Sequence, residues 1–381
     1  MRYLWAAVTA FALTLLLVGA IDACTAEAQW ARDLACATCS GVSMPHAATG
    51  WQAGSVQLPD QRPMSLPEQW QPVYSPTIES MLGAVSATLL SETICQLQST
   101  GQPTYCSELG TRYSYDMASL DEASRYLYQE FAGLGLSVAY DPFVWASTPM
   151  TNVVAELPGT GPHSHHIYIV CAHYDSYAHP MDGPAPGADD DASGCAAVVE
   201  AARILSQHCF PRTLRFVLFA GEEQWMRGSE HYAAEAAARG DRIDGVINLD
   251  MIGYESVPPG DHVIEIHAGT RPDSILLADA LIQCITLYDL NLAPEKLTTT
   301  AVTYCDQAPF WNHGYAGIMC IEDFQDFNPH YHKASDTLAN VQLPLVVEFT
   351  RATVAVLAEL ASARDTIVAP VRLYLPLIVS R

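Results

Sequence analysis

The strongest constraint on the fold is an alternation between short, almost wholly apolar segments and longer segments with helical periodicity. Near-continuous apolar strands are buried on both faces, and helices between them cover a mainly parallel sheet. We therefore predict an α/β fold. The predicted strands span 167–171, 214–220, 246–249, 263–266 and 317–321, and the predicted helices span 121–134, 193–207, 228–238, 274–290 and 345–361.

Polar residues come directly after three of these predicted strands. His173 follows the first, Glu222 and Glu223 follow the second, and Asp250 follows the third. Ligands of such sheets gather beyond the carboxyl ends of the strands. We therefore expect these four side chains to share one site.

Three adjacent aspartates, Asp189, Asp190 and Asp191, precede the predicted helix at 193–207. Helix capping and the helix dipole explain one or two acidic residues at such a position. They do not explain all three, because neighbouring carboxylates repel one another. A bound cation is the better interpretation of the run.

Two further positions carry candidate side chains. His332 lies in a loop, with His330 as its nearest competitor, and Asp175 lies two residues after His173, where it could hold that ring in place. The histidines at 163, 165 and 166 precede a predicted strand, and we interpret them as a solvated turn.

Two imidazoles and several carboxylates form the ligand set that two zinc ions with a bridging carboxylate require, with one glutamate left to transfer protons. The motifs H-E-x-x-H and G-x-S-x-G are absent from the sequence. Thermolysin-like and serine-hydrolase interpretations therefore have no support.

Five segments resemble a known family. They are HYDS, PGADDDASG, GEEQWMRGSE, NLDMIGY and NPHYHKASDTLAN, which start at His173, Pro186, Gly221, Asn248 and Asn328. Together, in this order and spacing, they are similar to the secreted bacterial leucyl aminopeptidases, whose zinc peptidase family also contains glutamate carboxypeptidases and glutaminyl cyclases. The resemblance runs from about Thr77 to Ala361. It implies a three-layer α/β/α sandwich around a mixed, mainly parallel sheet, which we place at residues 77–364.

The resemblance also implies roles for individual residues. One zinc ion would be held by His173 and Asp250, the other by Glu223 and His332, and Asp190 would bridge the two. Glu222 would be the general base and acid, and Asp175 would orient His173. Met251 and Phe324 would line an apolar specificity pocket. Tyr304 is a further substrate-binding candidate, although the disulfide that relatives carry near this tyrosine is represented here by one cysteine, Cys305.

These observations predict a two-zinc aminopeptidase that removes a large apolar, leucine-like residue from peptides with a free N-terminus. A water activated between the two zinc ions is the expected nucleophile. A glutaminyl cyclase or a carboxypeptidase on the same scaffold is the nearest alternative, with Arg227 as a possible carboxylate partner. A non-catalytic, receptor-like domain is the alternative from another class.

Lys and Arg number 18 against 42 Asp and Glu, so the net charge is −24. A surface this acidic repels phosphate backbones, which argues against a nucleic-acid partner. We predict a signal peptide at 1–23, a Pro- and Gln-rich arm at 24–76 and a short apolar tail at 365–381. The protein would be secreted, without stable membrane association after cleavage; an uncleaved anchor and a lipoprotein are the alternatives.

The 11 cysteines suit an oxidising compartment. Cys95 and Cys106 flank a polar insert and could close a small loop as a disulfide. Cys36 and Cys39 are better interpreted as a disulfide than as zinc ligands. Cys171, Cys195 and Cys320 lie in apolar runs and are expected in the core.

Overall fold

The computed structural model describes residues 70–102, 105–180, 183–256 and 260–362. Within these residues, eight strands form one mixed sheet in the order β1-β2-β4-β3-β5-β8-β6-β7. The central pairs β4–β3, β3–β5 and β5–β8 are parallel, as is β6–β7, whereas β1–β2, β2–β4 and β8–β6 are antiparallel. The strands are β1 (Ser137–Trp145), β2 (Thr148–Leu157), β3 (His166–His173), β4 (Thr213–Phe219), β5 (Arg242–Leu249), β6 (Val263–His267), β7 (Ala293–Leu297) and β8 (Gly317–Ile321).

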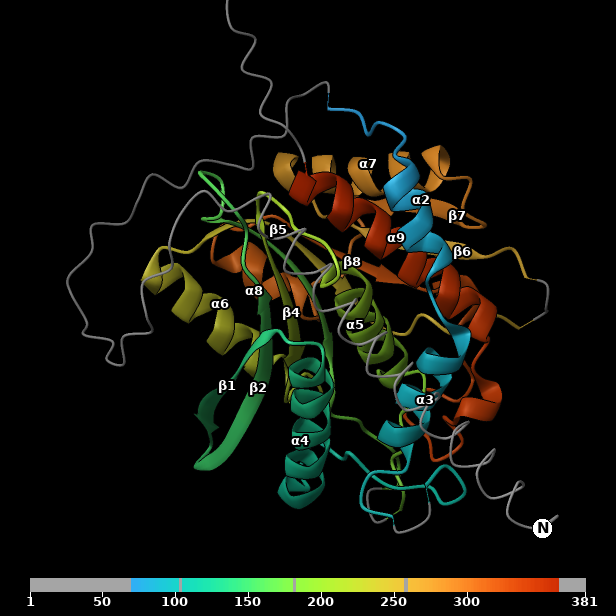
Figure 1. Ribbon diagram of the computed structural model, residues 1–381. Helices are drawn as coiled ribbons and strands as arrows, with labels where there is room; N and C mark the ends of the chain where they lie inside the picture. The colour runs from blue at the N-terminus through green and yellow to red at the C-terminus, as the bar shows by residue number, and fades with distance from the viewer. Residues whose placement is uncertain (1–69, 103–104, 181–182, 257–259, 363–381) are drawn as a thin grey trace, which may run out of the picture.

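Helices cover both faces of the sheet (Figure 1). One face is covered by α6 (Arg227–Arg239) and α8 (Gln307–Asn312). The other face is covered by α4 (Met117–Gly133), α5 (Ala192–Leu205), α7 (Pro272–Leu287) and α9 (Leu343–Ser362), with α2 (Pro76–Gly83) and α3 (Ala87–Gln98) packed on the outer side of this layer. The predicted α/β/α sandwich with a mixed, mainly parallel sheet is confirmed.

The central strand β3 explains why the sheet needs two helical layers. All eight of its residues are buried, and they alternate between two hydrophobic clusters. Ile167 and Ile169 pack into the cluster below α6 and α8, whereas Tyr168 and Val170 pack into the larger cluster with α5 and α9. Successive side chains of a strand point to opposite faces, so an apolar run of this kind is stable only between two layers.

The predicted elements all occur, with ends displaced by at most four residues and with β8 at the predicted residues. The helix predicted at 121–134 begins at Met117, because Asp116 caps it through hydrogen bonds from the N–H groups of Ala118 and Ser119. The hairpin β1–β2 and the strand β7 were not predicted. β1 and β7 are the edges of the sheet and are largely solvent-exposed, so neither carries the continuous apolar run that marks the central strands.

The predicted pairing of Cys95 with Cys106 is present, and Cys171, Cys195 and Cys320 are buried free thiols, as expected. One expectation was wrong. His166 is not part of a solvated turn, because it is buried at the start of β3 and its Nδ1 lies 2.6 Å from Asp244 Oδ2.

Several predictions concern residues outside the described part of the chain. They are the signal peptide at 1–23, most of the arm at 24–76, the Cys36–Cys39 pair and the tail at 365–381. Among the helices of the described residues, none has the length and apolar character needed to cross a membrane.

Candidate metal centre

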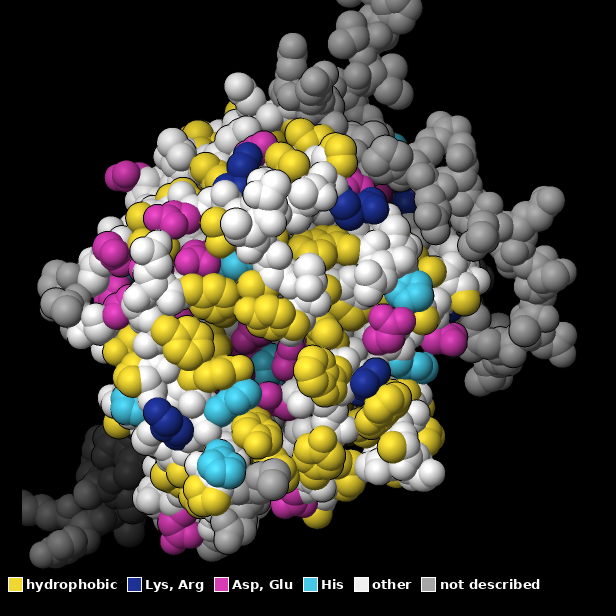
Figure 2. All heavy atoms as spheres, turned by 180° about the vertical axis from the view of Figure 1, so that it is seen from behind, with side chains coloured by type: hydrophobic (Ala, Val, Ile, Leu, Met, Phe, Trp, Pro, Cys, Tyr) yellow, Lys and Arg dark blue, Asp and Glu magenta, His cyan; other side chains and the backbone are white. Residues whose placement is uncertain are grey.

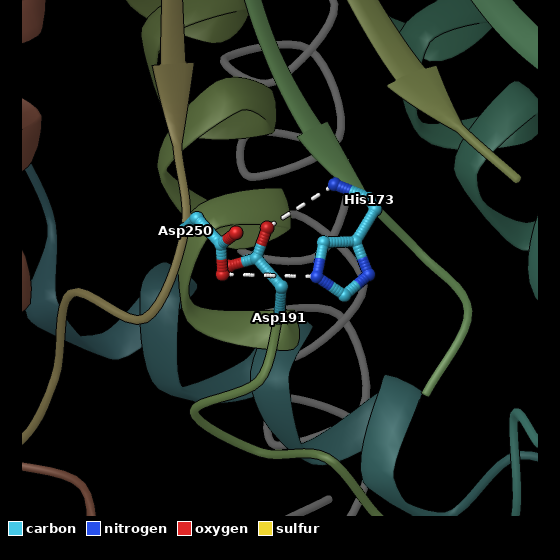
Figure 3. Close-up of side chains that lie close together, drawn as sticks. All are labelled: His173, Asp191 and Asp250. Atoms are coloured by element: carbon cyan, nitrogen blue, oxygen red, sulfur yellow. Dashed lines mark hydrogen bonds and ion pairs between the residues drawn. The ribbon is translucent and has the colours of Figure 1, made fainter. Parts of the chain in front are cut away.

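Three neighbouring strands deliver the predicted ligands to one edge of the sheet. His173 is the last residue of β3, Asp250 follows the end of β5, and Glu222 and Glu223 lie in the turn after β4. Because β4, β3 and β5 are adjacent and parallel, their carboxyl ends meet at this edge. Figure 3 shows the His173 ring directed at the Asp250 carboxylate, with Asp191 beside both.

The three consecutive aspartates have different surroundings. Asp191 caps α5 and accepts hydrogen bonds from the N–H groups of His173, Gly194 and Met251. Asp189 accepts from Gly253 N and from the Asn328 side-chain amide, at 2.8 and 2.7 Å. The carboxylates at both ends of the run are therefore engaged by the protein itself. Asp190 is not engaged in this way.

Asp190 lies between two groups of predicted ligands. Its Oδ1 is 3.2 Å from His173 Nε2, and its Oδ2 is 3.3 Å from His332 Nε2. His173 Nε2 is also 3.7 Å from Asp250 Oδ1, and His332 Nε2 is 3.1 Å from Glu223 Oε2. We call His173 and Asp250 the inner group, and Glu223 and His332 the outer group. Asp190 offers one oxygen to each group.

Ligand atoms of His173, Asp191 and Asp250 also lie within 4.8 Å of one another. This proximity makes Asp191 an alternative third ligand for the inner group. Its two oxygens already receive three backbone N–H groups, whereas Asp190 Oδ1 faces the His173 ring directly. Asp190, and not Asp191, is therefore the better candidate for a third ligand beside the inner group.

The inner histidine is held from behind by Asp175. The backbone carbonyl oxygen of Asp175 lies 3.0 Å from His173 Nδ1, and its carboxylate lies 3.6 Å away. The carboxylate accepts hydrogen bonds from the N–H groups of Glu222 and Glu223, at 3.1 and 3.3 Å. Asp175 therefore holds the ring of one group and the backbone turn that carries the two glutamates.

Burial and neighbouring charges shift the pKa values of several groups in the cluster. Burial raises the pKa of Glu222 well above its usual range, and burial together with the charge of Asp190 raises the pKa of Glu223 to about 7. Although burial opposes it, hydrogen bonding with Asp190 and Glu223 raises the pKa of His332 to about 10. Glu222, Glu223 and His332 therefore keep their protons to a higher pH than exposed groups of their kind, because little positive charge is present among these carboxylates.

The residues fit a pair of divalent cations. Among the described residues, Asp190 Oδ2 and Glu223 Oε1 are buried oxygens that accept no hydrogen bond of good geometry. A buried carboxylate without a partner is costly, and a metal ion supplies the missing positive charge. The donor set of two imidazoles and three carboxylates suits zinc, which binds nitrogen and oxygen ligands.

Sequence reasoning missed the residues that support the aspartate run from below. The Asp336 carboxylate accepts from Asp189 N and Asp190 N, at 2.9 and 3.0 Å. Arg112 is fully buried and donates to the carbonyl oxygens of Tyr174, Pro186 and Gly187. Both are far from the run in sequence, so spacing within a motif could not indicate them. Asp336 does lie within NPHYHKASDTLAN, one of the five resembling segments, which is the signal that could have indicated it.

Asp306 and Cys305 were also missed as neighbours of the site. Asp306 is buried, accepts a 2.5 Å hydrogen bond from Ser229 Oγ, and has its pKa raised to about 7 by burial. Cys305 Sγ lies within 4.8 Å of ligand atoms of Glu222 and Asp250. Both residues directly follow Tyr304. The sequence signal that could have indicated them is this position, because family members carry a disulfide in the corresponding stretch.

A cavity of about 390 Å³ opens beside the ligands. The predicted residues Met251, Phe324 and Tyr304 line it, as do Trp225, Cys305, Ile321, Phe327 and Tyr331, which were not predicted. His330 is not among the lining residues; its Nδ1 lies 2.9 Å from Ser335 Oγ. Figure 2 shows a recess with acidic and histidine side chains, surrounded by hydrophobic ones.

Comparisons with known proteins agree with this geometry. The model of Peptidase family M28 matches residues 152–357, which is more than half of the chain. This chain therefore belongs to Peptidase family M28, and the family resemblance of its sequence motifs is confirmed.

Individual relatives are more distant. Leucine aminopeptidase 1 of Trichophyton equinum is 30% identical over 221 residues, which cover 55% of this chain and 58% of the relative. The chain thus matches less than two thirds of the length of such curated relatives. YfbL of Escherichia coli, which is uncharacterized, is 27% identical over 290 residues, covering 69% of this chain and 86% of that protein.

Solved structures share the fold. The LapA aminopeptidase of Legionella pneumophila superposes with a TM-score of 0.63 at 21% identity, covering 78% of this chain and 79% of that one. A glutaminyl cyclase of Porphyromonas gingivalis superposes with a TM-score of 0.58 at 20% identity, covering 73% and 99%. At this level of identity the likeness concerns the fold, and both activities occur on it.

Proposed function

We propose that this protein is a zinc-dependent aminopeptidase with two metal ions. The observation that carries the proposal is the position of Asp190, whose two carboxylate oxygens face the inner and the outer group separately. His173 and Asp250 would hold one zinc ion, Glu223 and His332 the other, and Asp190 both. When bound, two zinc ions polarise a carbonyl oxygen and lower the pKa of water.

Glu222 is the acidic residue left over for proton transfer. Its backbone N–H is fixed by the Asp175 carboxylate, and its side chain lines the same cavity as the ligands. Burial raises its pKa, so it exchanges a proton more readily near neutral pH than an exposed glutamate does. In the proposed reaction Glu222 takes the proton of the attacking water and delivers it to the amine that leaves.

The cavity supports a preference for a large apolar first residue. Met251 is buried in its wall, and Phe324 packs against the same small hydrophobic cluster. Tyr304 is 58% exposed at the rim, where it could contact the substrate backbone. The acidic residues around the metal positions would favour the positive charge of a free N-terminus.

The two alternatives on this scaffold are less well supported. A carboxypeptidase needs a cation for the terminal carboxylate, but the guanidinium of Arg227 lies 3.6 Å over the Trp145 ring and Arg227 does not line the cavity. A glutaminyl cyclase would use the same fold with a single zinc ion, and the ligand pairs on both sides of Asp190 argue for two. Secretion, peptide partners and the absence of a nucleic-acid partner remain part of the proposal.

The decisive experiment is hydrolysis of leucine p-nitroanilide by zinc-loaded full-length protein. We expect turnover that a chelator abolishes and added zinc restores. Glu222→Gln should keep the zinc content and lower kcat by about 100- to 10,000-fold, whereas Glu235→Gln, an exposed change on α6, should alter neither. Turnover by metal-free protein, or wild-type kcat in Glu222→Gln, would refute the proposal. Cyclisation of N-terminal glutamine without release of leucine would favour the cyclase alternative.

A further inference from the structure

A chain of aromatic rings passes through the candidate metal centre. The His332 ring stacks on Tyr331 with the centroids 3.7 Å apart, and Tyr331 in turn packs against Phe327; both line the cavity. The Tyr177 ring, which does not line the cavity, has its centroid 4.8 Å from that of His332. The chain continues outside the cavity through Tyr113 and Tyr115, with centroid distances of 5.7 and 5.5 Å.

A short extended segment presents the last two tyrosines. Its residues alternate, so that Arg112 and Ser114 are fully buried while Tyr113 is partly buried and Tyr115 is 65% exposed. The segment pairs with the loop after β3: Ser114 N donates to Ser176 O at 3.0 Å, and Ser176 N donates to Arg112 O at 2.8 Å. The two rings are therefore held on a fixed backbone.

The same segment is tied to the turn that carries the glutamates. The side-chain amide of Gln224, the residue after Glu223, donates a hydrogen bond to the carbonyl oxygen of Ser114. Burial, followed by the charges of Tyr177, Tyr115 and Glu223, raises the pKa of Tyr113. The tyrosines thus lie on the flank of the outer group.

This placement indicates which part of a substrate would reach them. In the function proposed above, the cavity beside Met251, Cys305 and Phe324 takes the side chain of the first residue. Tyr177 and Tyr113 do not line that cavity, although Tyr177 neighbours His332. They are therefore left to contact the part of a peptide that follows the scissile bond. Tyrosine rings supply large contact areas with little loss of side-chain entropy, and aromatic pairs add to the stability of such contacts.

We propose that Tyr177, Tyr113 and Tyr115 bind the substrate residues that follow the scissile bond, and that they favour peptides with aromatic residues there. The proposal rests on the aminopeptidase function proposed above. An extended chain advances about 3.3–3.6 Å per residue. The first residue after the scissile bond would therefore contact Tyr177 and Tyr113, and the second would contact Tyr115.

The test compares two tripeptide amides, Leu-Phe-Phe and Leu-Gly-Gly, with leucinamide as the substrate that lacks any following residue. The zinc-loaded full chain should show a kcat/KM for Leu-Phe-Phe about 10-fold or more above that for Leu-Gly-Gly, as expected from two ring contacts. In Tyr113→Ala/Tyr115→Ala this ratio should fall to about 2 or less. Tyr113→Phe/Tyr115→Phe should restore it, because the rings and not the hydroxyl groups make the contact.

Tyr140→Ala is the matched control, since Tyr140 is an exposed tyrosine on β1 outside the aromatic chain, and it should keep the wild-type ratio. The single change Tyr115→Ala removes only an exposed ring and should lower the ratio by itself if the double variant folds poorly. A wild-type ratio in Tyr115→Ala and in the double variant would overturn this inference while leaving the aminopeptidase function intact. Failure of wild-type protein to cleave any of the three substrates would overturn both.

Discussion

The inner and outer groups use the same kinds of ligand but are built differently. His173 and Asp250 extend from the ends of two neighbouring strands, and their side chains are 2% and 9% exposed. Glu223 and His332 come from loops, and the His332 side chain is 28% exposed. The inner group therefore inherits the rigidity of the sheet, whereas the outer group depends on contacts between loops.

The contacts of the histidine in the outer group include two aromatic rings. The His332 ring stacks on Tyr331 and neighbours Tyr177, and the His332 backbone has a left-handed φ of 54°. Such a ring can move more easily than one at the end of a buried strand. Two metal positions with similar ligands should therefore differ in how quickly they exchange their metal.

The largest effect should come from the residue that joins the two groups. We expect Asp190→Asn to lower kcat/KM by at least about 1,000-fold, because one change weakens both metal positions. Zinc content, measured by mass spectrometry on the folded protein, should fall below the wild-type value at both sites.

The neighbouring aspartates provide the control for this prediction. Asp189→Asn and Asp191→Asn disturb hydrogen bonds to backbone N–H groups and to Asn328, so they should lower the free energy of unfolding while zinc binding is retained. If all three variants lost zinc equally, the distinction drawn between Asp190 and its neighbours would be wrong.

The next effect separates the two groups from each other. His332→Gln should lower the affinity of the outer group for its zinc ion by more than about 100-fold and leave the zinc ion of the inner group tightly bound. In wild-type protein, a chelator at limiting concentration should remove the outer ion first, since the outer group is more exposed. In a stopped-flow experiment, wild-type protein should lose zinc to the chelator in two phases, and His332→Gln should lack the faster phase. If His332→Gln lacked the slower phase instead, the outer group would be the one that holds its metal ion more firmly.

A smaller effect concerns the loop side of the cavity. Phe324→Ala should lower kcat/KM for leucine p-nitroanilide by about 10-fold, because the cavity loses an aromatic wall. The same variant should change hydrolysis of alanine p-nitroanilide much less, since a methyl side chain does not reach that wall. Equal losses for both substrates would show that Phe324 acts on the metal centre and not on the first residue of the substrate.

The difference between the two groups also explains how much of the site the sequence could predict. The ligands at strand ends were predictable, because an apolar run marks the strand and the polar residue that ends it marks the edge of the sheet. The same logic located β3, β4, β5, β6 and β8. It failed for the hairpin β1–β2 and for β7, of which β1 and β7 are exposed edge strands, and for His166, whose partner Asp244 lies 78 positions away in the sequence.

The supporting residues could not be predicted for the same reason. Arg112 binds carbonyl oxygens 62 to 75 positions away, and no local pattern marks a buried arginine. Tyr113 and Tyr115 precede both the first of the resembling motifs, at His173, and the residues 152–357 that match the family model, so no motif marked them. The residues that pack around a site are brought there by the fold, whereas a ligand at the end of a strand is placed by its local sequence.

The smallest expected effect tests how the sheet supports the cavity wall. His267 is fully buried at the end of β6, and its Nε2 lies 3.0 Å from Glu265 Oε2. Its Nδ1 accepts a hydrogen bond from Val302 N, and Glu265 Oε1 accepts one from Phe324 N. Protonation would place a second hydrogen on Nδ1, opposite the Val302 N–H, so this site favours the neutral ring.

Burial lowers the pKa of His267 to about 4, whereas the unfolded value is about 6.5. The folded pKa lies below the unfolded one, so the stabilisation is complete above pH ~6.5 and is lost as the pH falls towards 4. Between pH 7 and pH 5 this loss amounts to about 2 kcal/mol. His267→Gln can keep both hydrogen bonds without titrating, so its free energy of unfolding should fall by about 2 kcal/mol less than that of wild-type protein over this interval. Glu265 is present in both proteins, and its own titration largely cancels in the difference.

Urea unfolding at the two pH values measures this difference, and His165→Gln, at an exposed histidine, should behave as wild-type protein does. An identical pH dependence in wild-type protein and His267→Gln would mean that the ring accepts a proton in the folded state. The bond between His267 and Glu265 would then be an ion pair, and β6 would hold the Phe324 backbone through charge. The Phe324 wall of the cavity would then depend on the His267–Glu265 ion pair. At a pH where this pair is lost, the ratio of kcat/KM for leucine p-nitroanilide to that for alanine p-nitroanilide should fall.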